Sequence, residues 1–583
     1  MCGLFGAINK NGLIDLSLAM ESLDLLSHRG PDGRGEWHNG NVVLGHRRLS
    51  ILDLSDTGAQ PMISDQCVIA VNGEIYNYKE LKRELQVTCH FKSGSDSEVI
   101  LHGYNTWGLD RLLEKIDGMY AITIFDRIHQ KLFLIRDRLG IKPLFYADTK
   151  EGFIWSSELK SIVDYLSLGE KDINTESLLD FVTYRYIPSP KTLYRNVYKL
   201  PAAHVICFTL SSKKLQQTKY WDLPLRENND SLEEAIICTE SLLEKSIKEQ
   251  LISDVPVGSF LSGGIDSGLL IALCNKLGYS IPTFSIGFDD QKYDESARIK
   301  QTSEYLNIEN SLRIINEEET ADLFSNMRDW FDEPFADFST LPTYSVCKYA
   351  RENVTVALSG DGADELFAGY PRYLLADKML RNSGDCNITH SMGLLKRFFG
   401  WRFSGRLIRL IESKLFLSGW DWYCFSMGGM LPNESALLAN RLGIPGDYDR
   451  YWLYRKHWRS DLPRGKALRV LEMETSLPEA LLTKVDRVSM RCSLEVRVPY
   501  LSKELVEYAF SLGDDILVRK GIPKYLLREL GRRYLPAEIC TASKKGFGIP
   551  PSLRLSRKRR RCSVQYKTLV EEYCFEDLIS AIK

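Results

Sequence analysis

Short apolar runs that end at turn residues fill the first 205 residues of the chain. Three of them are CVIAVNGEIYN, MYAITIFD and KLFLIRDRLG, and β-branched or aromatic residues are prominent in each. Such runs predict strands, and the scarcity of long helical patterns between them favours antiparallel sheets with a few helices. We therefore expect an α+β domain over residues 1–210, followed by a polar, aperiodic linker over residues 211–230.

A different pattern begins at residue 231. Apolar residues recur at helical spacing in SLEEAIICTESLLEKSIKEQL, behind a Ser231 that can cap the helix. The runs VPVGSFLSGGIDSG, PTFSIGF and VTVALSGDGADE then each end in a Gly-rich turn, with helical stretches between them. Short buried strands that alternate with helices predict an α/β domain with a doubly wound parallel sheet, which we expect over residues 231–583.

Composition narrows the class of protein. With 583 residues, 44% apolar and 26% charged, the chain is expected to form two or three globular domains. A net charge of −2 argues against nucleic acid as a partner, and no apolar stretch approaches the roughly 20 residues that cross a bilayer. The basic run at 557–561 fits a solvated surface. Thirteen cysteines without a CxxC pair, and no visible signal peptide, predict reduced thiols in a cytoplasmic protein.

The first candidate for chemistry is Cys2, which stands directly behind the initiator Met1 in MCGLFG. Removal of Met1 would give one residue both a thiol nucleophile and a free α-amine, whose pKa of about 8 suits a general base. Position alone leaves an ordinary thiol near a frayed chain end as the alternative. Four further stretches with polar tips decide between the two: HRGPDG, HRRLSILDLS, VNGEIYN and SGSDSEVI.

Together with MCGLFG, these stretches resemble the class II, N-terminal-cysteine glutamine amidotransferases. The resemblance implies that Cys2 attacks the side-chain amide of glutamine while its α-amine moves the proton. It also implies an oxyanion hole made by the Asn72 side-chain NH₂ and the Gly73 backbone N–H, where the absence of a side chain at Gly73 lets substrate approach. His28 and His46 are expected to be hydrogen-bonded scaffold, because the α-amine already supplies a base.

The same resemblance assigns the two charged ends of substrate glutamine. Arg48 would hold the α-carboxylate with a bidentate guanidinium, while Glu74 and Asp96 would take the α-ammonium. Each residue has an ordinary interpretation by itself: Asn-Gly is a common hairpin dipeptide, and Asp96 could cap a helix. Their occurrence in this order behind Cys2 favours the catalytic interpretation.

A second set of motifs lies in the later part of the chain. In SFLSGGIDSG, a strand ends in Ser-Gly-Gly-x-Asp-Ser and leads into a helix, where backbone amides and hydroxyls make an anion nest. The stretch lacks the GxxxxGK[ST] of a Walker A loop and matches the loop of enzymes that split ATP into AMP and pyrophosphate. The residues expected to bind ATP here are Phe260, Ser262, Gly263, Gly264, Asp266 and Ser267.

The stretch ALSGDGADELFAGY crowds Asp361, Asp364 and Glu365 into one turn. Like charges so close together are costly unless a cation or a basic group is bound, and Mg²⁺ prefers a few carboxylates with phosphate oxygens. We therefore expect Asp266 and Asp364 to hold Mg²⁺ against the leaving pyrophosphate. The remaining expected site residues of this half are Asp361, as a catalytic residue, and Ile286, Ser359 and Gly360, as contacts of ATP.

With LLTKVDRVSMRCSLEVRVPYL near its end, the chain resembles the glutamine-hydrolysing asparagine synthetases over nearly its full length. Lys484 falls where that family places a lysine near the reacting phosphates and the acyl-adenylate. Gly268, Ser502, Ala542 and Asn310 depart from the family's usual residues. Because these departures lie in the synthetase half, they leave the acceptor of ammonia open.

The resemblance implies a fold in which an N-terminal nucleophile glutaminase domain precedes an ATP-pyrophosphatase domain. The first would free ammonia from glutamine, the second would adenylate a carboxylate, and an enclosed route would keep the ammonia neutral. Aspartate is the expected acceptor, and related enzymes suggest a homodimer. Two alternatives stay open: another carboxylate, such as a sugar acid of a surface polysaccharide or a peptide precursor, and a non-catalytic binding or regulatory protein on the same fold.

Overall fold

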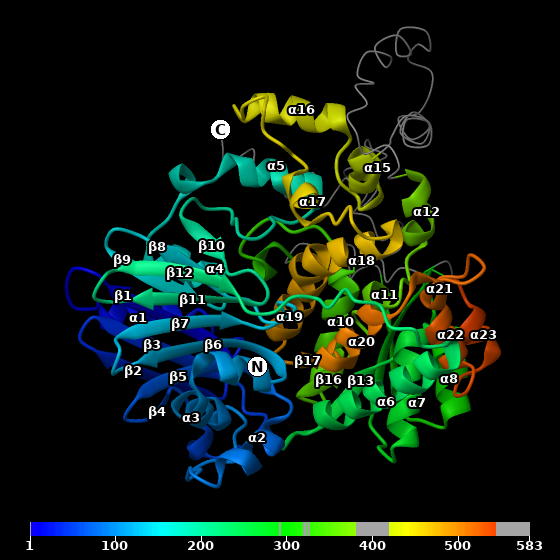
Figure 1. Cartoon of the computed structure of the whole chain (residues 1–583), viewed down its shortest axis with the longest axis horizontal. Helices are drawn as coiled ribbons and strands as arrows, with labels where there is room; N and C mark the ends of the chain where they lie inside the picture. Colours follow the sequence, from blue (N-terminus) through cyan, green and yellow to red (C-terminus); the bar gives the residue numbers. More distant parts are fainter. Residues whose placement is uncertain are drawn as a thin grey trace.

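The computed structural model describes residues 2–290, 293–316, 319, 323, 327–337, 339–379 and 419–543. The basic run at 557–561 lies outside the described residues. Figure 1 shows a domain of sheets, coloured blue to cyan, beside a domain coloured green to orange. The N-terminal end of the chain lies where the two domains meet, so the stretch that begins with Cys2 is placed at the junction.

The N-terminal domain is built on two antiparallel sheets of six strands each, which confirms the strands predicted from the short apolar runs. The strand orders are β10-β8-β9-β1-β3-β2 and β12-β11-β7-β6-β5-β4. The strands are β1 (Gly3–Asn9), β2 (Gly33–Asn39), β3 (Val42–Arg48), β4 (Met62–Ile63), β5 (Cys67–Ile75), β6 (Gly118–Asp126), β7 (Lys131–Arg136), β8 (Phe145–Asp148), β9 (Gly152–Ser156), β10 (Val197–Lys199), β11 (His204–Thr209) and β12 (Lys214–Lys219).

Alternation of side chains along the strands explains how this domain is layered. In β1, Leu4 and Ile8 join the apolar core between the two sheets, whereas Phe5 and Ala7 join a second core on the opposite face. Helices cover both outer faces, which gives a helix–sheet–sheet–helix sandwich. The helices of this domain are α1 (Leu16–Asp24), α2 (Tyr78–Leu85), α3 (Glu98–Lys115), α4 (Leu159–Tyr165) and α5 (Thr175–Tyr184).

The predicted linker is partly structured. Strand β12 lies inside residues 211–230 and pairs with β11, so the second sheet extends into the stretch whose polar composition predicted only a connector. An edge strand with one solvated face contains few apolar residues, which explains why its pattern is weak.

The second domain has the predicted parallel sheet, with strand order β15-β14-β13-β16-β17. The order runs outward from β13 to β14 and β15 on one side and to β16 and β17 on the other. In such sheets, ligands bind beyond the carboxyl ends of the strands where the order reverses, here β13 and β16. The strands are β13 (Val257–Phe260), β14 (Thr283–Phe288), β15 (Asn310–Ile315), β16 (Val356–Leu358) and β17 (Glu495–Arg497).

Helices surround this sheet, and the first of them begins as predicted. Ser231 accepts a hydrogen bond from the Glu234 backbone nitrogen and caps α6. A π-helical turn at Leu477–Leu482 leads into α19. The helices are α6 (Leu232–Gln250), α7 (Ile265–Lys276), α8 (Ser296–Leu306), α10 (Thr340–Arg351), α11 (Ala363–Leu366), α12 (Pro371–Met379), α15 (Gly419–Ser426), α16 (Pro432–Arg441), α17 (Trp452–His457), α18 (Arg464–Glu474), α19 (Thr483–Arg491), α20 (Lys503–Ser511), α21 (Asp514–Leu517), α22 (Tyr525–Gly531) and α23 (Ala537–Thr541).

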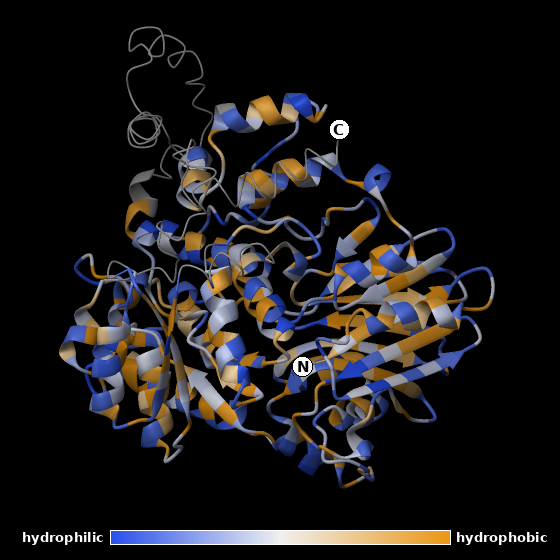
Figure 2. Cartoon of the chain, turned by 180° about the vertical axis from the view of Figure 1, so that it is seen from behind, coloured by the Kyte–Doolittle hydropathy of each residue, from blue (hydrophilic) through white to orange (hydrophobic). Residues whose placement is uncertain are grey.

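The two domains share buried apolar contacts. Leu139 and Ile141 of the first domain belong to the same core as Leu477, Leu482 and Leu501 of the second. Figure 2 shows apolar residues, in orange, along the strands of both domains. A continuous core across the junction holds the two sheets in a fixed relationship, because sliding them apart would expose these side chains.

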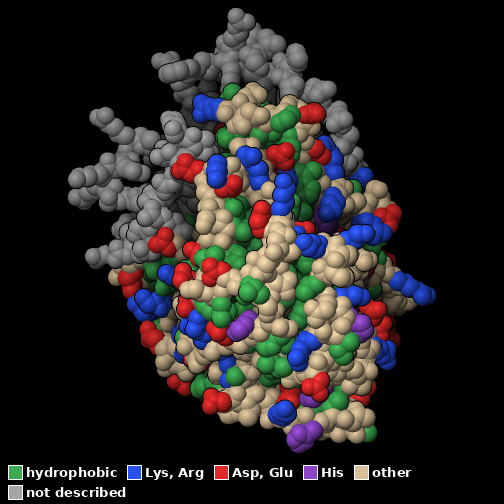
Figure 3. All heavy atoms as spheres, turned by 90° about the vertical axis from the view of Figure 1, so that its left-hand side faces the viewer, with side chains coloured by type: hydrophobic (Ala, Val, Ile, Leu, Met, Phe, Trp, Pro, Cys, Tyr) green, Lys and Arg blue, Asp and Glu red, His purple; other side chains and the backbone are tan. Residues whose placement is uncertain are grey.

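On the face shown in Figure 3, Lys and Arg side chains lie among Asp and Glu side chains. Among the described residues, no cysteine forms a disulfide. Within the described ranges, no helix is both long enough and apolar enough to cross a membrane.

Candidate active sites

Cys2 is buried at the start of β1, and its backbone nitrogen donates a hydrogen bond to Asn72 Oδ1 at 2.9 Å. Removal of Met1 would turn this nitrogen into the α-amine. Burial raises the pKa of the Cys2 thiol, while the Leu49 backbone amide and the Arg48 guanidinium favour the thiolate. The predicted nucleophile is therefore enclosed, and its backbone nitrogen is already oriented.

Asn72 lies inside β5 and is fully buried. Because the Cys2 nitrogen is a donor, the acceptor atom must be Oδ1, and this assigns the other atom as the amide Nδ2. Nδ2 makes no hydrogen bond to any residue that the structure describes. A buried amide donor without a partner is costly, so this NH₂ group fits an acceptor that arrives with substrate.

Gly73 is also in the interior of β5, where it pairs with Tyr120 of β6. The hairpin-turn alternative for Asn72 and Gly73 is therefore wrong. At Gly73, φ is +153°, and a Cβ atom would lie 2.0 Å from the Met119 carbonyl oxygen. The close neighbouring strand demands glycine here, which is a different reason from the predicted approach of substrate.

Glu74 and Asp96 form a buried acidic pair near the end of β5. Asp96 Oδ2 accepts a hydrogen bond from the Ile75 backbone nitrogen at 2.7 Å, and no side chain caps α3, so the helix-cap alternative is wrong. Burial raises the pKa of Asp96 to about 6, and burial together with Asp96 and Glu495 raises the pKa of Glu74. Ionisation of two buried, neighbouring carboxyl groups is unfavourable, and a cationic ligand such as an α-ammonium would favour their ionised form.

Arg48 is half-buried, and its guanidinium binds the loop after β3. Nη1 donates to the Ser55 carbonyl at 2.9 Å, and Nη2 donates to the carbonyls of Leu52 and Asp53. In this conformation the terminal nitrogens face main-chain acceptors, and the bidentate contact with a glutamine carboxylate stays a prediction.

The two histidines have the expected scaffold contacts. His46 Nε2 lies 3.0 Å from the Val71 carbonyl, and burial lowers its pKa to about 3, so the ring is neutral. His28 Nε2 lies 3.1 Å from Glu158 Oε1.

Two neighbours of this site were not predicted from the sequence. Arg29 is fully buried, and its Nε donates to the Cys2 carbonyl at 3.0 Å. From the second domain, Arg497 of β17 places Nη2 3.6 Å from Glu74 Oε1. Arg29 stands in the HRGPDG motif and Arg497 in EVRVPYL, so both motifs were visible in the sequence. The contact of Arg29 with Cys2 and the contact of Arg497 with Glu74 across the domains were not.

The second predicted site begins at the end of β13. The Ser262 backbone nitrogen donates to Ser267 Oγ at 3.0 Å, the two hydroxyl oxygens lie 2.9 Å apart, and the Gly264 backbone nitrogen donates to Ser262 Oγ at 3.3 Å. This turn precedes Ile265, the first residue of the 12-residue helix α7. The turn therefore lies at the positive end of the helix dipole, where phosphate binds favourably.

The turn after β16 packs directly on this nest. A Cβ atom at Gly360 would lie 3.1 Å from the Asp266 Cβ and from the Ser267 backbone nitrogen. Ser359 Oγ donates to Asp361 at 2.6 Å. The predicted ATP contacts from the two motifs thus come together, because β13 and β16 are adjacent in the sheet.

Lys524 lies between the two predicted metal ligands. Its Nζ donates to Asp266 Oδ1 at 2.6 Å and to Asp364 Oδ1 at 2.7 Å, and it is buried. The crowded acids predict a cation or a basic group, and Lys524 is that basic group, although nothing in its own stretch of sequence predicts the contact. Glu365 instead accepts from the Tyr370 hydroxyl at 2.6 Å.

The fit of Mg²⁺ to this place rests on the two carboxylates that converge on one cation. Among the described residues, no group of three or more His, Cys, Asp and Glu side chains could hold a metal. Mg²⁺ commonly binds through one or two carboxylates plus phosphate oxygens, so Asp266 and Asp364 suffice in number. Lys524 Nζ would have to leave the space between them.

Phe260 and Ile286 belong to one apolar cluster at the carboxyl ends of β13 and β14, beside the nest. Lys484 is buried on α19, and its Nζ donates to Ser339 Oγ at 2.8 Å. Burial would raise the pKa of Asp337, but Lys484 and Arg185 hold it below its usual value. The contact of Lys484 with phosphates stays a prediction.

Two of the departures from the family pattern have structural roles. Asn310 Oδ1 accepts from the hydroxyls of Thr283 and Ser285 at 2.9 and 2.8 Å, which ties β15 to β14. A Cβ atom at Gly268 would lie 3.3 Å from Leu535, so glycine permits close packing of α7.

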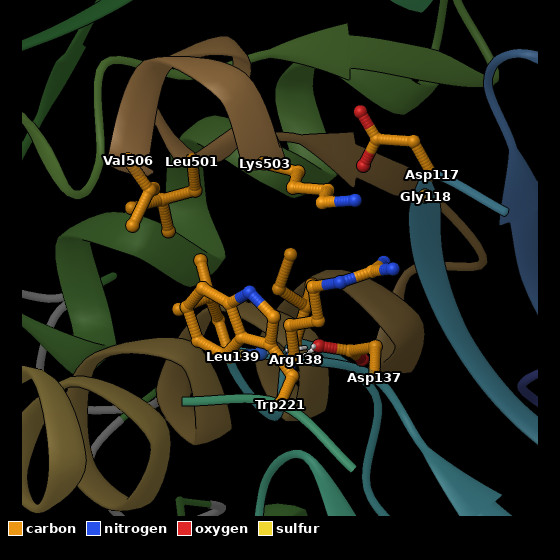
Figure 4. Close-up of a pocket in the computed structure, with 10 residues that line it drawn as sticks. Asp117, Gly118, Asp137, Arg138, Leu139, Trp221, Leu501, Lys503 and Val506 are labelled. Carbon is orange, nitrogen blue, oxygen red and sulfur yellow. Dashed lines mark hydrogen bonds between the residues drawn. The ribbon is translucent and has the colours of Figure 1, made fainter. Parts of the chain in front are cut away.

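A small cavity lies between the domains, apart from both predicted sites. Its volume is about 10 Å³, at the lower limit for one water molecule. Figure 4 shows Lys503 extending across it toward Asp117, with Arg138 and Trp221 on the opposite wall. Arg138 donates to the carbonyls of Ile116 and Leu113. Lys503 Nζ of the second domain donates to the Glu114 carbonyl of the first at 3.4 Å. This contact joins the domains at the cavity, which has no room for a substrate.

Fold and sites together define a class of protein: a buried Cys2 in front of the first strand of a helix–sheet–sheet–helix sandwich, joined to a parallel sheet that has a Ser/Gly turn at a helix N-terminus where the strand order reverses. Residues 239–569 match the asparagine synthase family, and residues 1–221 match the glutamine amidotransferase domain. Asparagine synthetase 1 (glutamine-hydrolyzing) of Bacillus subtilis (strain 168) is 30% identical over 94% of this chain and 87% of its own length.

Two further relatives are similar over most of the chain. Asparagine synthetase 3 (glutamine-hydrolyzing) of the same Bacillus strain is 28% identical, over 94% of this chain and 87% of its own length. Amidase chry2 of Gibberella zeae is also 28% identical, over 91% of this chain and 84% of its own length.

The chain belongs to the asparagine synthase family. It is a glutamine-dependent amidating ligase that uses ATP, and this excludes the non-catalytic alternative.

Proposed function

We propose that the protein makes asparagine from aspartate, with glutamine as the source of ammonia and ATP as the activating co-substrate. The observation that carries the glutaminase half is the hydrogen bond from the Cys2 nitrogen to Asn72, whose Nδ2 is buried and unpaired within the described part of the chain. The choice of aspartate is supported by relatives that bear the asparagine synthetase name and match over 87% of their own length.

In the proposed hydrolysis, Cys2 Sγ attacks the side-chain amide carbon of glutamine and passes its proton to the α-amine. Asn72 Nδ2 and the Gly73 backbone N–H would stabilise the oxyanion, and Glu74 and Asp96 would bind the substrate's α-ammonium. The α-amine then protonates the departing ammonia. Water hydrolyses the thioester that remains and releases glutamate.

In the proposed synthesis, an oxygen of the aspartate side chain attacks the α-phosphate of ATP, and pyrophosphate leaves. The nest formed by Ser262, Gly264 and Ser267 would hold the phosphates, with Phe260 and Ile286 beside the base. Ammonia then attacks the acyl carbon, and AMP leaves. Mg²⁺, when bound by Asp266 and Asp364, would supply positive charge against the phosphates.

A second candidate is the same chemistry on another carboxylate. The relative named an amidase is as similar to this chain as one of the asparagine synthetases, and it covers nearly as much of the chain. Overall similarity therefore does not determine which carboxylate accepts the ammonia.

An acceptor panel separates the two candidates. Purified protein with glutamine and Mg-ATP is given aspartate or, in parallel, sugar acids and peptides with free carboxylates, and AMP and amide product are quantified. We expect AMP and asparagine in equal amounts with aspartate. AMP release with another acid, and none with aspartate, would transfer the proposal to that acid.

A further inference from the structure

Arg29 connects the nucleophile to the synthetase domain through one buried guanidinium. Its Nε donates to the Cys2 carbonyl at 3.0 Å, while Nη1 and Nη2 donate to the two oxygens of Asp486 at 2.8 and 3.1 Å. Nη1 also donates to Glu158 Oε1 at 3.0 Å. Arg29, Glu158 and Asp486 are all buried, and Asp486 belongs to α19 of the second domain.

The geometry of this contact makes Asp486 an orienting group. A guanidinium is planar, and a bidentate carboxylate fixes both the position and the plane of its two terminal nitrogens. The direction of Nε, and so of its hydrogen bond to the Cys2 carbonyl, follows from that plane. Lys142, with Nζ 3.9 Å from Asp486 Oδ1, supports the same carboxylate from the first domain.

Cys2 is thereby held at both ends of its backbone. Asn72 accepts from its nitrogen, and Arg29 donates to its carbonyl oxygen. A nucleophile must lie within about 3–3.5 Å of its target, and a misplacement of about 1 Å can cost about a hundredfold in rate. Loss of the hydrogen bond from Arg29 to the Cys2 carbonyl would let Sγ move by a distance on the order of 1 Å.

The segment that carries Asp486 also contacts the synthetase site. Lys484, two residues earlier, donates to Ser339, and the Arg497 carbonyl of β17 accepts from the Ser359 backbone nitrogen at 2.8 Å. On the glutaminase side, Ser493 Oγ donates to the His28 carbonyl at 2.7 Å.

We propose that Asp486 is a positioning residue for glutamine hydrolysis, supplied to the glutaminase site by the synthetase domain. The proposal rests on the proposed role of Cys2 as the nucleophile. It implies that the glutaminase site is complete only when α19 is docked against Arg29.

The test is Asp486→Asn in the full chain, which keeps the shape but removes the charge and turns an amide NH₂ toward Arg29. We expect glutaminase kcat to fall by about tenfold or more while the glutamine KM changes by less than about threefold, since positioning acts in the transition state. The rate constant for alkylation of Cys2 by iodoacetamide, measured by mass spectrometry, should change by a similar factor. Ammonia-dependent synthesis should stay within about threefold of the parental rate.

The matched control is Asp332→Asn. Asp332 binds Arg487, the next residue on α19, through a similar bidentate contact at 2.7 and 2.8 Å, but it does not contact Arg29. Arg487 Nη2 lies 3.3 Å from Glu158 Oε2, and Glu158 binds Arg29, so Asp332 is linked to Arg29 through two intervening side chains. Glutaminase kcat should therefore fall clearly less in this variant than in Asp486→Asn, and ammonia-dependent synthesis should stay within about threefold of the parental rate.

An unchanged glutaminase kcat in Asp486→Asn would overturn the proposal. Equal loss of both activities in Asp486→Asn and in Arg29→Lys would also overturn it, because Asp486 would then serve the fold alone. A parental enzyme without glutaminase activity would instead contradict the proposed function, and the inference would fall with it.

Discussion

The Asn72 side chain holds the Cys2 backbone nitrogen with one atom and leaves its other polar atom buried and unpaired within the described residues. The group that orients the future α-amine is therefore the same amide that would receive the oxyanion. Both atoms belong to the planar Asn72 amide. The distance between the Cys2 nitrogen and Asn72 Nδ2 is therefore fixed by the packing of β1 against β5, which belong to different sheets.

Replacement of Asn72 by alanine should remove both functions without harming the other domain. We expect glutaminase kcat to fall by at least about a hundredfold, as for other single oxyanion donors, with a smaller change in glutamine KM. Steady-state glutamate release measures both constants, and ammonia-dependent synthesis should persist.

The control for this variant is Asn77→Ala. Asn77 donates to the Lys115 carbonyl and accepts from the Asp117 backbone nitrogen, so it ties loops together close to the same strand. The Asn77→Ala substitution should lower thermal stability and leave glutaminase kcat unchanged. Near-parental kcat in a folded Asn72→Ala protein would remove Asn72 from the mechanism.

Glutamine binding should weaken in acid. The pKa of Asp96 is raised to about 6, and the carboxylate form attracts the α-ammonium of glutamine. Below this pKa the ionised fraction falls about tenfold per pH unit, so KM for glutamine should rise as pH falls from 7 to 5. The Asp96→Asn variant should show a high KM that hardly changes over this range. A parental KM that is flat between pH 5 and 7 would contradict the role of Asp96.

Gly73 should not tolerate alanine. Its Cβ would lie 2.0 Å from the Met119 carbonyl at a φ of +153°, so the strands must separate or shift. We expect a loss of about 1–3 kcal/mol in the free energy of unfolding, as for other overpacked sites, together with loss of glutaminase activity. Gly169→Ala, at a site with no atom within 4 Å and an ordinary φ, should leave chemical denaturation unchanged. Equal midpoints for the two variants would contradict this account.

The acids at the nest should matter only to the synthetase reaction. Asp266→Asn and Asp364→Asn should lose most acceptor-dependent pyrophosphate release, because charge on the phosphates is then poorly neutralised. Glutamate release in the same preparations should continue. Parental synthesis by either variant at saturating Mg-ATP would exclude that residue as a metal ligand.

Contacts that follow from local pattern were predictable from the sequence. The strand that contains Asn72 and Gly73 and the turn around Ser262 each lie within one short motif. Asp266 and Asp364 come together because motifs that follow adjacent parallel strands share one edge of the sheet. In each case a general rule converts residue order into position.

No such rule predicts contacts between charged residues that are far apart in the sequence. Arg29 and Asp486 are 457 residues apart, and Lys524 and Asp266 are 258 apart. A buried ion pair depends on how whole domains or helices pack, and a lysine or arginine in a polar stretch gives no sign of its partner. The need for glycine at position 73 was also invisible, because it comes from the carbonyl of a strand that pairs later in the chain.

We propose that ammonia freed at Cys2 becomes the side-chain amide of asparagine. The most direct test of this proposal is the incorporation of ¹⁵N from amide-labelled glutamine into asparagine, with Mg-ATP, aspartate and an excess of unlabelled ammonium present. We predict labelled asparagine in equal amount to AMP, little diluted by the ammonium, and only unlabelled asparagine from Cys2→Ala. Labelled amide on a different acid, or no label in any amide while glutamine is consumed, would contradict the proposed function.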